Sequence, residues 1–193
     1  MKEKIGFIGF GSMGQALADG LLAAGIVKKE QLYACAQHWE KLKHNTEIRG
    51  MHACKTVEDT ILQSDIILIA IKPDQIPEVL GSVKELLSDK IVISLAAGMF
   101  YDTYELLLLP KTHHLSIIPN MPVSVCEGII LWEQHNSLNA AEAALVEALL
   151  SSVALIEKLD SEQMTIGATV AGCGPAFAAM FVEAVGDGAV AYG

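Results

Sequence analysis

The chain has 193 residues, which is enough for one complete domain and part of another, because single domains usually contain about 100–200 residues. Hydrophobic residues make up 52% and charged residues 19%, a composition that excludes a disordered chain. The formal net charge of -10, with 13 scattered lysines and arginines, argues against a nucleic-acid partner, whose phosphates require clustered basic side chains.

The lengths of the apolar runs, the start of the sequence and the cysteines indicate the cellular location of the protein. No run of apolar residues reaches the roughly 18–20 needed to cross a bilayer, and the strand pattern begins at Lys4 without the features of a signal peptide. We therefore expect a cytoplasmic protein with no membrane partner. The cysteines show no CxxC spacing and no histidine pairing, so we interpret them as reduced thiols and expect no metal site. They are Cys35, Cys54, Cys126 and Cys173.

Short β-branched runs alternate with helical patterns, which is typical of parallel strands joined by crossover helices. The first strand is expected at 4–10, and Met13, Leu17 and Leu21 then recur at helical spacing up to a stop at Gly25. The range 65–71 is nearly all Ile and Leu, as expected of a central strand covered on both faces. Further strands are expected at 31–36, 51–54 and 91–95, and further helices at 39–49, 57–62, 73–87 and 100–109.

The later part of the chain changes character. After a strand at 114–118, the run Pro119-Asn120-Met121-Pro122 has two prolines, which we expect to prevent regular structure. Strands at 129–132 and 153–157 enclose a helix that Asn139 caps, with Glu142 at its third position. After Asp160 only Ala- and Gly-rich helical patterns remain. We therefore expect two domains, 1–159 and 160–193, the second of them incomplete.

The sharpest motif is Gly9-Phe10-Gly11-Ser12-Met13-Gly14, which follows a strand and opens a helix as the dinucleotide-binding fingerprint requires. Gly9 permits the tight turn, Gly11 lets the backbone approach a diphosphate, and Gly14 lets helix and strand pack closely. The free N–H groups at the start of the helix suit phosphates. We expect an α/β fold, with a Rossmann-type doubly wound, mostly parallel sheet followed by the start of an all-α second domain. A glycine-rich turn that binds no ligand is the alternative.

The end of the second strand bears on the choice of cofactor. It lacks the acidic residue that accepts hydrogen bonds from the ribose of NAD. Gln37 and His38 follow this strand, with Lys41 and Lys43 close by, and these side chains can donate to a 2′-phosphate. We therefore expect NADP(H) as the preferred cofactor, with NAD(H) as the alternative. An ordinary exposed loop histidine remains open as an interpretation of His38.

A further candidate lies at the carboxyl end of the central strand, where open α/β sheets bind their ligands. The run Ala70-Ile71-Lys72-Pro73 ends this strand and places Lys72 there. Contact with the cofactor and simple solvation of a lysine at a strand exit are equally compatible with this position.

Five motifs occur in a characteristic order and spacing. They are the run 4–13, the run 70–73, Ser94-Leu95-Ala96-Ala97-Gly98, Pro119-Asn120-Met121-Pro122 with Glu127-Gly128, and Gly172-Cys173-Gly174-Pro175-Ala176-Phe177. Together they resemble the pyrroline-5-carboxylate reductase family over essentially the whole chain. The resemblance implies an oxidoreductase of proline biosynthesis that passes a hydride from NAD(P)H to the imine carbon of 1-pyrroline-5-carboxylate, which gives L-proline. A protonated imine is already electrophilic, so no catalytic triad or metal is expected.

The resemblance also implies roles for single residues. Those expected to hold the cofactor are Gly9, Phe10, Gly11, Ser12, Met13, Gly14, Gln37, Ile71, Lys72, Pro73, Ala97 and Asn120, the last near the nicotinamide. The substrate-pocket candidates are Asn120, Cys173, Gly174 and Pro175, with a turn at 172–175 forming one wall, and no catalytic side chain is assigned. Glu162 is a further candidate, although a carboxylate in the first turn of a helix is also favoured by the helix dipole.

Three positions depart from the family's pattern. Met121 stands where the family has Thr, and Cys173 stands where it has Ser. Near Val57 the family has an Asn that helps to hold the cofactor, and this chain lacks it. Each change removes a hydrogen-bonding group, so we expect altered geometry on the substrate side. Family members continue into further helices, including a segment that binds the substrate carboxylate. We therefore expect a C-terminally truncated chain that binds cofactor but turns over poorly alone.

The final helix predicts self-association. Phe177, Met180, Phe181 and Val185 make it apolar around much of its circumference, unlike a one-sided surface helix. The second domains of the family interlock as dimers, so we expect a homo-oligomer.

Two other functions are compatible with the fingerprint. A non-catalytic NADP-binding paralogue is suggested by Met121, Cys173 and the position at which the sequence stops. A dehydrogenase of the hydroxyacid or 6-phosphogluconate type uses a Lys and an Asn on a long interdomain helix, and we find no matching pair.

Overall fold

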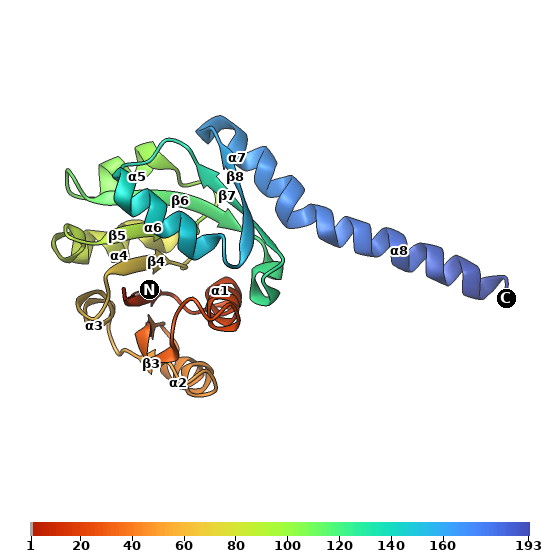
Figure 1. The fold of residues 1–193 in the computed structure, drawn as a ribbon, viewed down its shortest axis with the longest axis horizontal. Helices are drawn as coiled ribbons and strands as arrows, with labels where there is room; N and C mark the ends of the chain where they lie inside the picture. The colour runs from red at the N-terminus through yellow and green to blue at the C-terminus, as the bar shows by residue number, and fades with distance from the viewer. Residues whose placement is uncertain (1) are drawn as a thin grey trace.

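The computed structural model describes residues 2–193, so Met1 of the expected first domain lies outside the described residues. An eight-stranded sheet with the order β3-β2-β1-β4-β5-β6-β7-β8 forms the body (Figure 1). Its neighbouring strands are parallel except for β6 and β7. The expected Rossmann-type, mostly parallel sheet is therefore confirmed. The strands are β1 (Ile5–Ile8), β2 (Leu32–Cys35), β3 (His52–Ala53), β4 (Ile66–Ile69), β5 (Ile91–Ser94), β6 (His113–Pro119), β7 (Gly128–Glu133) and β8 (Ala154–Leu159).

Helices cover both faces of this sheet. One face packs against α1 (Ser12–Ala23), α2 (Trp39–Glu47) and α6 (Ala140–Leu150). The other packs against α3 (Val57–Leu62), α4 (Ile76–Val83) and α5 (Tyr101–Leu107). Four 3-10 helices complete the body: η1 (Lys29–Gln31), η2 (Pro73–Gln75), η3 (Lys84–Leu87) and η4 (Met121–Val125).

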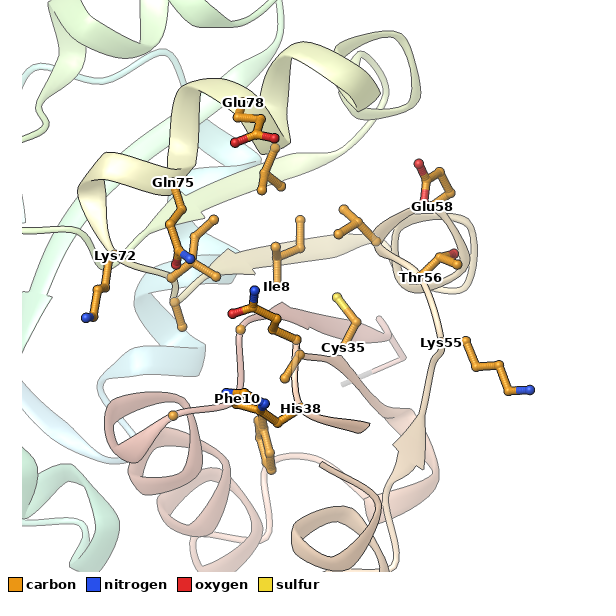
Figure 2. Close-up of a pocket in the computed structure, with 18 residues that line it drawn as sticks. Ile8, Phe10, Cys35, His38, Lys55, Thr56, Glu58, Lys72, Gln75 and Glu78 are labelled. Atoms are coloured by element: carbon orange, nitrogen blue, oxygen red, sulfur yellow. The ribbon is translucent and has the colours of Figure 1, made fainter. Parts of the chain in front are cut away.

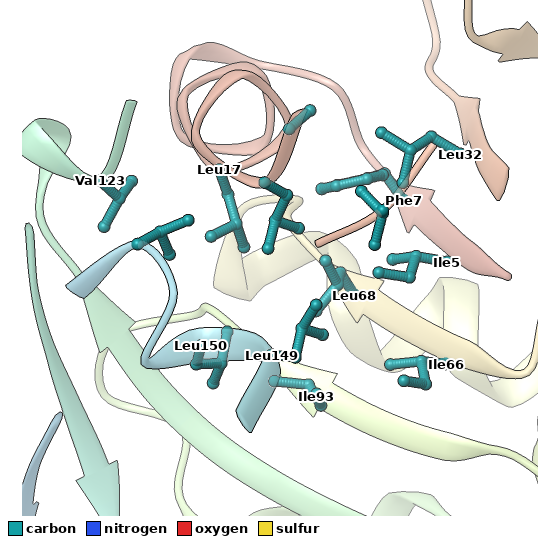
Figure 3. Close-up of a cluster of buried hydrophobic side chains, with 14 of the residues drawn as sticks. Ile5, Phe7, Leu17, Leu32, Ile66, Leu68, Ile93, Val123, Leu149 and Leu150 are labelled. Carbon is teal, nitrogen blue, oxygen red and sulfur yellow. The ribbon is translucent and has the colours of Figure 1, made fainter. Parts of the chain in front are cut away.

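The core follows from the alternation of side chains along each strand. In β4 every residue is fully buried, with Leu68 facing α1 and Ile69 facing the other layer. Figure 3 shows Leu17 of α1 and Leu149 of α6 meeting the strand residues in the first cluster. The central strand predicted from the run at 65–71 is therefore covered on both faces, as expected of a parallel sheet.

The predicted cap of α6 is confirmed. The side chain of Asn139 accepts hydrogen bonds from the backbone N–H groups of Ala141 and Glu142, both at 3.0 Å. The carboxylate of Glu142 accepts one from the N–H of Asn139 at 2.9 Å. This reciprocal arrangement satisfies donors that the first turn of a helix leaves without partners.

The expectation that 119–122 is irregular is wrong. Pro119 is the last residue of β6 and lies beyond Ser116, where the pairing of β6 with β5 ends. Pro122 is the second residue of η4, where the N–H has no partner within the helix in any case. Both prolines therefore lie at positions where no backbone N–H donor is needed.

The expected turn at 172–175 is also wrong, although the absence of strand patterns after Asp160 is confirmed among the described residues. The chain continues as α7 (Ser161–Ala168), the short π-helix η5 (Thr169–Cys173) and α8 (Gly174–Ala191). Pro175 is the second residue of α8, and the wider π turn before it lets the helix continue. The domain division at 159 stays a prediction.

Helix α8 extends away from the body (Figure 1), and none of its side chains is buried. The helical stretch Ser161–Ala191 is, among residues 2–193, long and apolar enough to cross a membrane by length and composition alone. This stretch contains no uninterrupted apolar run of that length, because Glu183 and Asp187 interrupt the pattern. One such helix is weak evidence, since a helix that packs against other protein meets the same criteria.

The buried phenol of Tyr104 in α5 is expected to make the stability of the fold depend on pH in the alkaline range. Burial raises the pKa of Tyr104 to about 12, while its hydrogen bond to Ser94 lowers it and the carboxylate of Glu133 raises it. In the unfolded chain the phenol ionises near the ordinary pKa of 10.0, so unfolding releases a proton above that pH and stability falls between about pH 10 and pH 12. Tyr104→Phe is expected to weaken this loss, measured by urea unfolding at about pH 9 and pH 11. Tyr192→Phe, on an exposed residue, is the control, and equal losses in both variants would contradict the prediction.

Candidate cofactor site

A crevice of about 750 Å³ lies at the carboxyl ends of β1, β2 and β4 (Figure 2). Strand β1 stands between β2 and β4, so the chain leaves the sheet centre in opposite directions on its two sides. Open α/β sheets bind ligands at such a switch point, and the volume is within the usual range for small-molecule sites. The crevice is therefore the candidate cofactor site.

The turn after β1 requires glycine at its first position. Gly9 has φ +92°, and a Cβ there would lie 2.6 Å from the carbonyl oxygen of Ala70. The N–H of Gly9 donates to the carbonyl of Cys35 at 2.9 Å, which joins the turn to β2. Gly14 is close to this turn too, because its added Cβ would lie 3.1 Å from the Gly9 carbonyl oxygen. These contacts support the predicted roles of the first and third glycines.

The middle glycine faces open space. A Cβ added to Gly11 would meet no atom within 4 Å, although Gly11 is the N-cap of α1 and lines the crevice. No side chain caps α1, and its first turn carries no acidic residue. The first-turn N–H groups thus keep their capacity to bind an anion, and the dipole of the helix favours negative charge there. This end of α1 fits the diphosphate of a dinucleotide.

The end of β2 lines the same crevice. Gln37 and His38 are both lining residues, as the sequence predicted. Neither Lys41 nor Lys43 lines the crevice, and Lys43 pairs with Glu47 at 3.8 Å along α2, so their contact with a 2′-phosphate stays a prediction. The lysine at this end is Lys55, which follows β3 and which the sequence analysis missed.

The opposite wall comes from the segment after β4. Ile71 and Lys72 line the crevice, and Figure 2 shows Gln75 and Glu78 beside them on η2 and α4. Of the predicted cofactor residues, Ser12, Met13, Gly14, Pro73, Ala97 and Asn120 are not lining residues. The lining residues that sequence reasoning missed follow β3 and β4; they include Lys55, Thr56, Glu58, Gln75, Glu78 and Val79.

Cys35 contributes an apolar surface to the crevice. Burial raises the pKa of the Cys35 thiol, despite hydrogen bonding with Thr60, so the group stays neutral at physiological pH. The four cysteines are free thiols. A neutral thiol at this position adds no charge that would repel a phosphate.

The substrate-side candidates lie apart from the crevice lining. Asn120 is 6% exposed and uses both polar atoms within the protein: its Nδ2 donates to the carbonyl of Ala171 at 3.0 Å, and its Oδ1 accepts from the N–H of Ile129 at 2.8 Å. Glu162 and Cys173 are exposed on the helical segment. Gly174 and Pro175 begin α8. Their contact with substrate stays a prediction.

Comparisons with known proteins agree with this geometry. The family model described as NADP oxidoreductase, coenzyme F420-dependent, matches residues 4–98, the part of the chain that contains the crevice. Pyrroline-5-carboxylate reductase of Treponema pallidum is 42% identical over 193 residues, which cover 98% of this chain and 73% of that protein. The chain belongs to the pyrroline-5-carboxylate reductase family. The resemblance inferred from the five motifs is thereby confirmed.

Solved structures of the family extend the match to three dimensions. The Plasmodium falciparum pyrroline carboxylate reductase, a structure with NADP bound, has a TM-score of 0.89 and 31% identity, covering 100% of this chain and 71% of that one. The Coxiella burnetii pyrroline-5-carboxylate reductase has a TM-score of 0.87 and 29% identity, covering 98% of this chain and 71% of that one. The fold of pyrroline-5-carboxylate reductases therefore includes the helical segment after β8.

Proposed function

We propose that this chain binds NADP(H) in the crevice and serves the reduction of the imine carbon of 1-pyrroline-5-carboxylate to L-proline. The observation that carries the proposal is the open space at Gly11 in front of the uncapped start of α1, in a member of this family. NADP in the Plasmodium relative supports the choice of cofactor. NADP(H) is preferred and NAD(H) is the alternative, because β2 ends in Cys35 and is followed by Gln37 and His38 without a carboxylate.

The tasks of the chain's own residues are binding and orientation. The backbone N–H groups of the first turn of α1 bind the diphosphate, and Gln37 and His38 donate to the phosphorylated ribose. Ile71 and the neutral Cys35 thiol exclude water from the walls. A bound reduced dinucleotide supplies a hydride. Because a protonated imine is already electrophilic, holding the reactants together contributes most of the rate enhancement.

Binding and turnover are measured separately. Fluorescence titration with NADPH and NADH is expected to show saturable binding with NADPH favoured, and NADPH consumption with 1-pyrroline-5-carboxylate tests reduction. Absence of saturable binding contradicts the proposal. Binding without reduction, in this chain and in one extended to the length of its relatives, favours the non-catalytic paralogue. Oxidation of hydroxyacids with NADP would favour the other class of dehydrogenase.

We also propose that the chain self-associates through α8. Phe177, Met180 and Phe181 are each at least 65% exposed, and water contact with such side chains is unfavourable. A groove of about 460 Å³ between β7, β8 and α7 has an apolar lining that includes Leu131 and Leu155. Light scattering over a concentration series is expected to give a mass above that of one chain, and Phe181→Glu is expected to lower it.

The cytoplasmic location, and the absence of membrane and nucleic-acid partners, stay predictions.

A further inference from the structure

Glu133, at the end of β7, is a buried carboxylate that none of the proposed binding steps uses. It is 0% exposed, and among the described residues no lysine or arginine pairs with it. Its carboxylate accepts from the backbone N–H of Tyr101 at 3.1 and 3.2 Å and from the hydroxyl of Ser161 at 2.5 Å. Tyr101 is the first residue of α5 and Ser161 the first of α7. Burying a charge is costly unless donors compensate it, and the starts of two helices supply them here.

These contacts join two separate parts of the chain. Helix α5 directly follows the loop 95–100, which contains Ala97, a residue expected beside the cofactor. Helix α7 begins the segment that leads to Cys173. The ring of Tyr101 also stacks on His135, two residues beyond Glu133, with ring centroids 3.8 Å apart. The end of β7 therefore holds the start of α5 through both backbone and side-chain contacts, and holds α7 through Ser161.

A second polar contact holds the other end of the same segment. The side chain of Asn120 donates to the carbonyl of Ala171 in the π-helix and is itself fixed by the N–H of Ile129. A π turn departs from the regular helical hydrogen-bond pattern and occurs often at functional sites. The segment 161–173 is thus bound to the sheet near its first residue by Glu133 and near its last by Asn120.

Apolar packing alone fixes this segment weakly. Met164 is its one fully buried side chain, and close packing is otherwise seen at Gly167, where an added Cβ would lie 2.7 Å from Leu159 and 2.9 Å from Leu131. Beyond Cys173, helix α8 buries no side chain. The two polar contacts therefore decide how the start of α8 is placed relative to the sheet.

We propose that Glu133 and Asn120 are positioning residues, which clamp the two ends of segment 161–173 and so set the place of Cys173, Gly174 and Pro175 beside the imine. This inference rests on the proposed function for its substrate. The clamp acts on the substrate side of the site, because the crevice that receives the dinucleotide contains neither residue.

The decisive variant is Ser161→Ala, which removes one donor to Glu133 without opening a core cavity. A hydrogen bond to a charged group shifts an equilibrium by about tenfold or more, so amide hydrogen exchange over 161–173 is expected to accelerate about tenfold. The Kd for NADPH is expected to stay within about twofold, while KM for the imine rises at least about fivefold with a smaller change in kcat. Ser152→Ala is the matched control, since it removes a hydroxyl bonded to the Leu149 carbonyl, and neither group contacts Glu133, Asn120 or segment 161–173 through a hydrogen bond.

Substitutions at Glu133 separate its hydrogen bonding from its volume. Glu133→Gln keeps an acceptor for both donors, so its exchange rates and its KM are expected to stay near the original values. Glu133→Leu removes the acceptor, so its exchange rates and its KM are expected to rise at least as much as those of Ser161→Ala. If Glu133→Leu does not fold, Ser161→Ala and Glu133→Gln decide the question.

Three results would overturn the clamp: exchange over 161–173 equal in the Ser161→Ala and Ser152→Ala variants, an unchanged KM in an active enzyme, or a Kd for NADPH that rises in parallel with KM. Exchange does not depend on turnover. A chain that neither binds NADPH nor reduces the imine therefore contradicts the proposed function, while the exchange result still decides the clamp.

Discussion

Gly11→Val is expected to remove NADPH binding while the protein stays folded. The valine side chain would enter the open space in front of α1, where a Cβ meets no protein atom within 4 Å and where the diphosphate is proposed to lie. Loss of the phosphate contacts is expected to raise the Kd at least about 100-fold, equivalent to about 2.7 kcal/mol. Fluorescence titration with NADPH measures the Kd, and urea unfolding measures stability, which is expected to fall by about 1 kcal/mol or less.

Gly81→Val is the matched control for this variant. Gly81 lies in α4, and a Cβ there also meets nothing within 4 Å, but the residue does not line the crevice. NADPH is expected to bind this variant as it binds the original protein. Unaltered NADPH affinity in Gly11→Val would show that the diphosphate lies elsewhere, and the proposed cofactor site would be abandoned.

Gly20→Ala is expected to be the most destabilising methyl addition in α1. A Cβ at Gly20 would lie 2.0 Å from the carbonyl oxygen of Val123, so α1 and η4 would have to move apart. Overpacking against side chains typically costs about 1–3 kcal/mol, and a backbone oxygen cannot rotate away, so we expect a loss of about 3 kcal/mol in the free energy of unfolding. Urea unfolding measures it.

The same substitution in α4 is expected to have the opposite sign. Gly81→Ala meets nothing within 4 Å, and alanine is favoured over glycine within a helix by about 0.5–1 kcal/mol. The two variants make the same chemical change in helices, so they separate helix propensity from contact with η4. Equal stabilities for the two would mean that α1 and η4 do not pack as closely as the structure shows.

Most of the sheet was predictable because its signals are local. In the run at 65–71, nearly all residues facing either side of the sheet are apolar, as a parallel strand buried on both faces requires. Asn139 and Glu142 mark the start of α6 within four residues. The fingerprint was recognisable for the same reason, since all its requirements lie between Gly9 and Gly14.

The parts that were missed depend on contacts between distant residues. Lys55 follows β3 and Gln75 follows β4, and both line the crevice because β1 lies between β2 and β4 in the sheet. The order of strands in a sheet cannot be predicted from any single segment of the sequence. The stretch from Gly172 to Pro175 looks like a turn by composition, but it continues a helix whose π turn is fixed by Asn120, which is 51 residues from its acceptor Ala171. Local propensity was overridden there by tertiary structure.

Every residue that lines the crevice comes from the stretch 8–79, whereas the imine-side candidates after β8 belong to the last helices of the chain. The proposed site thus assigns affinity for the electron donor and selectivity for its acceptor to different sets of side chains, and substitutions in separate sets are expected to have nearly additive effects. Evolution can therefore retune which electrophile is reduced without rebuilding the half that recognises the nucleotide.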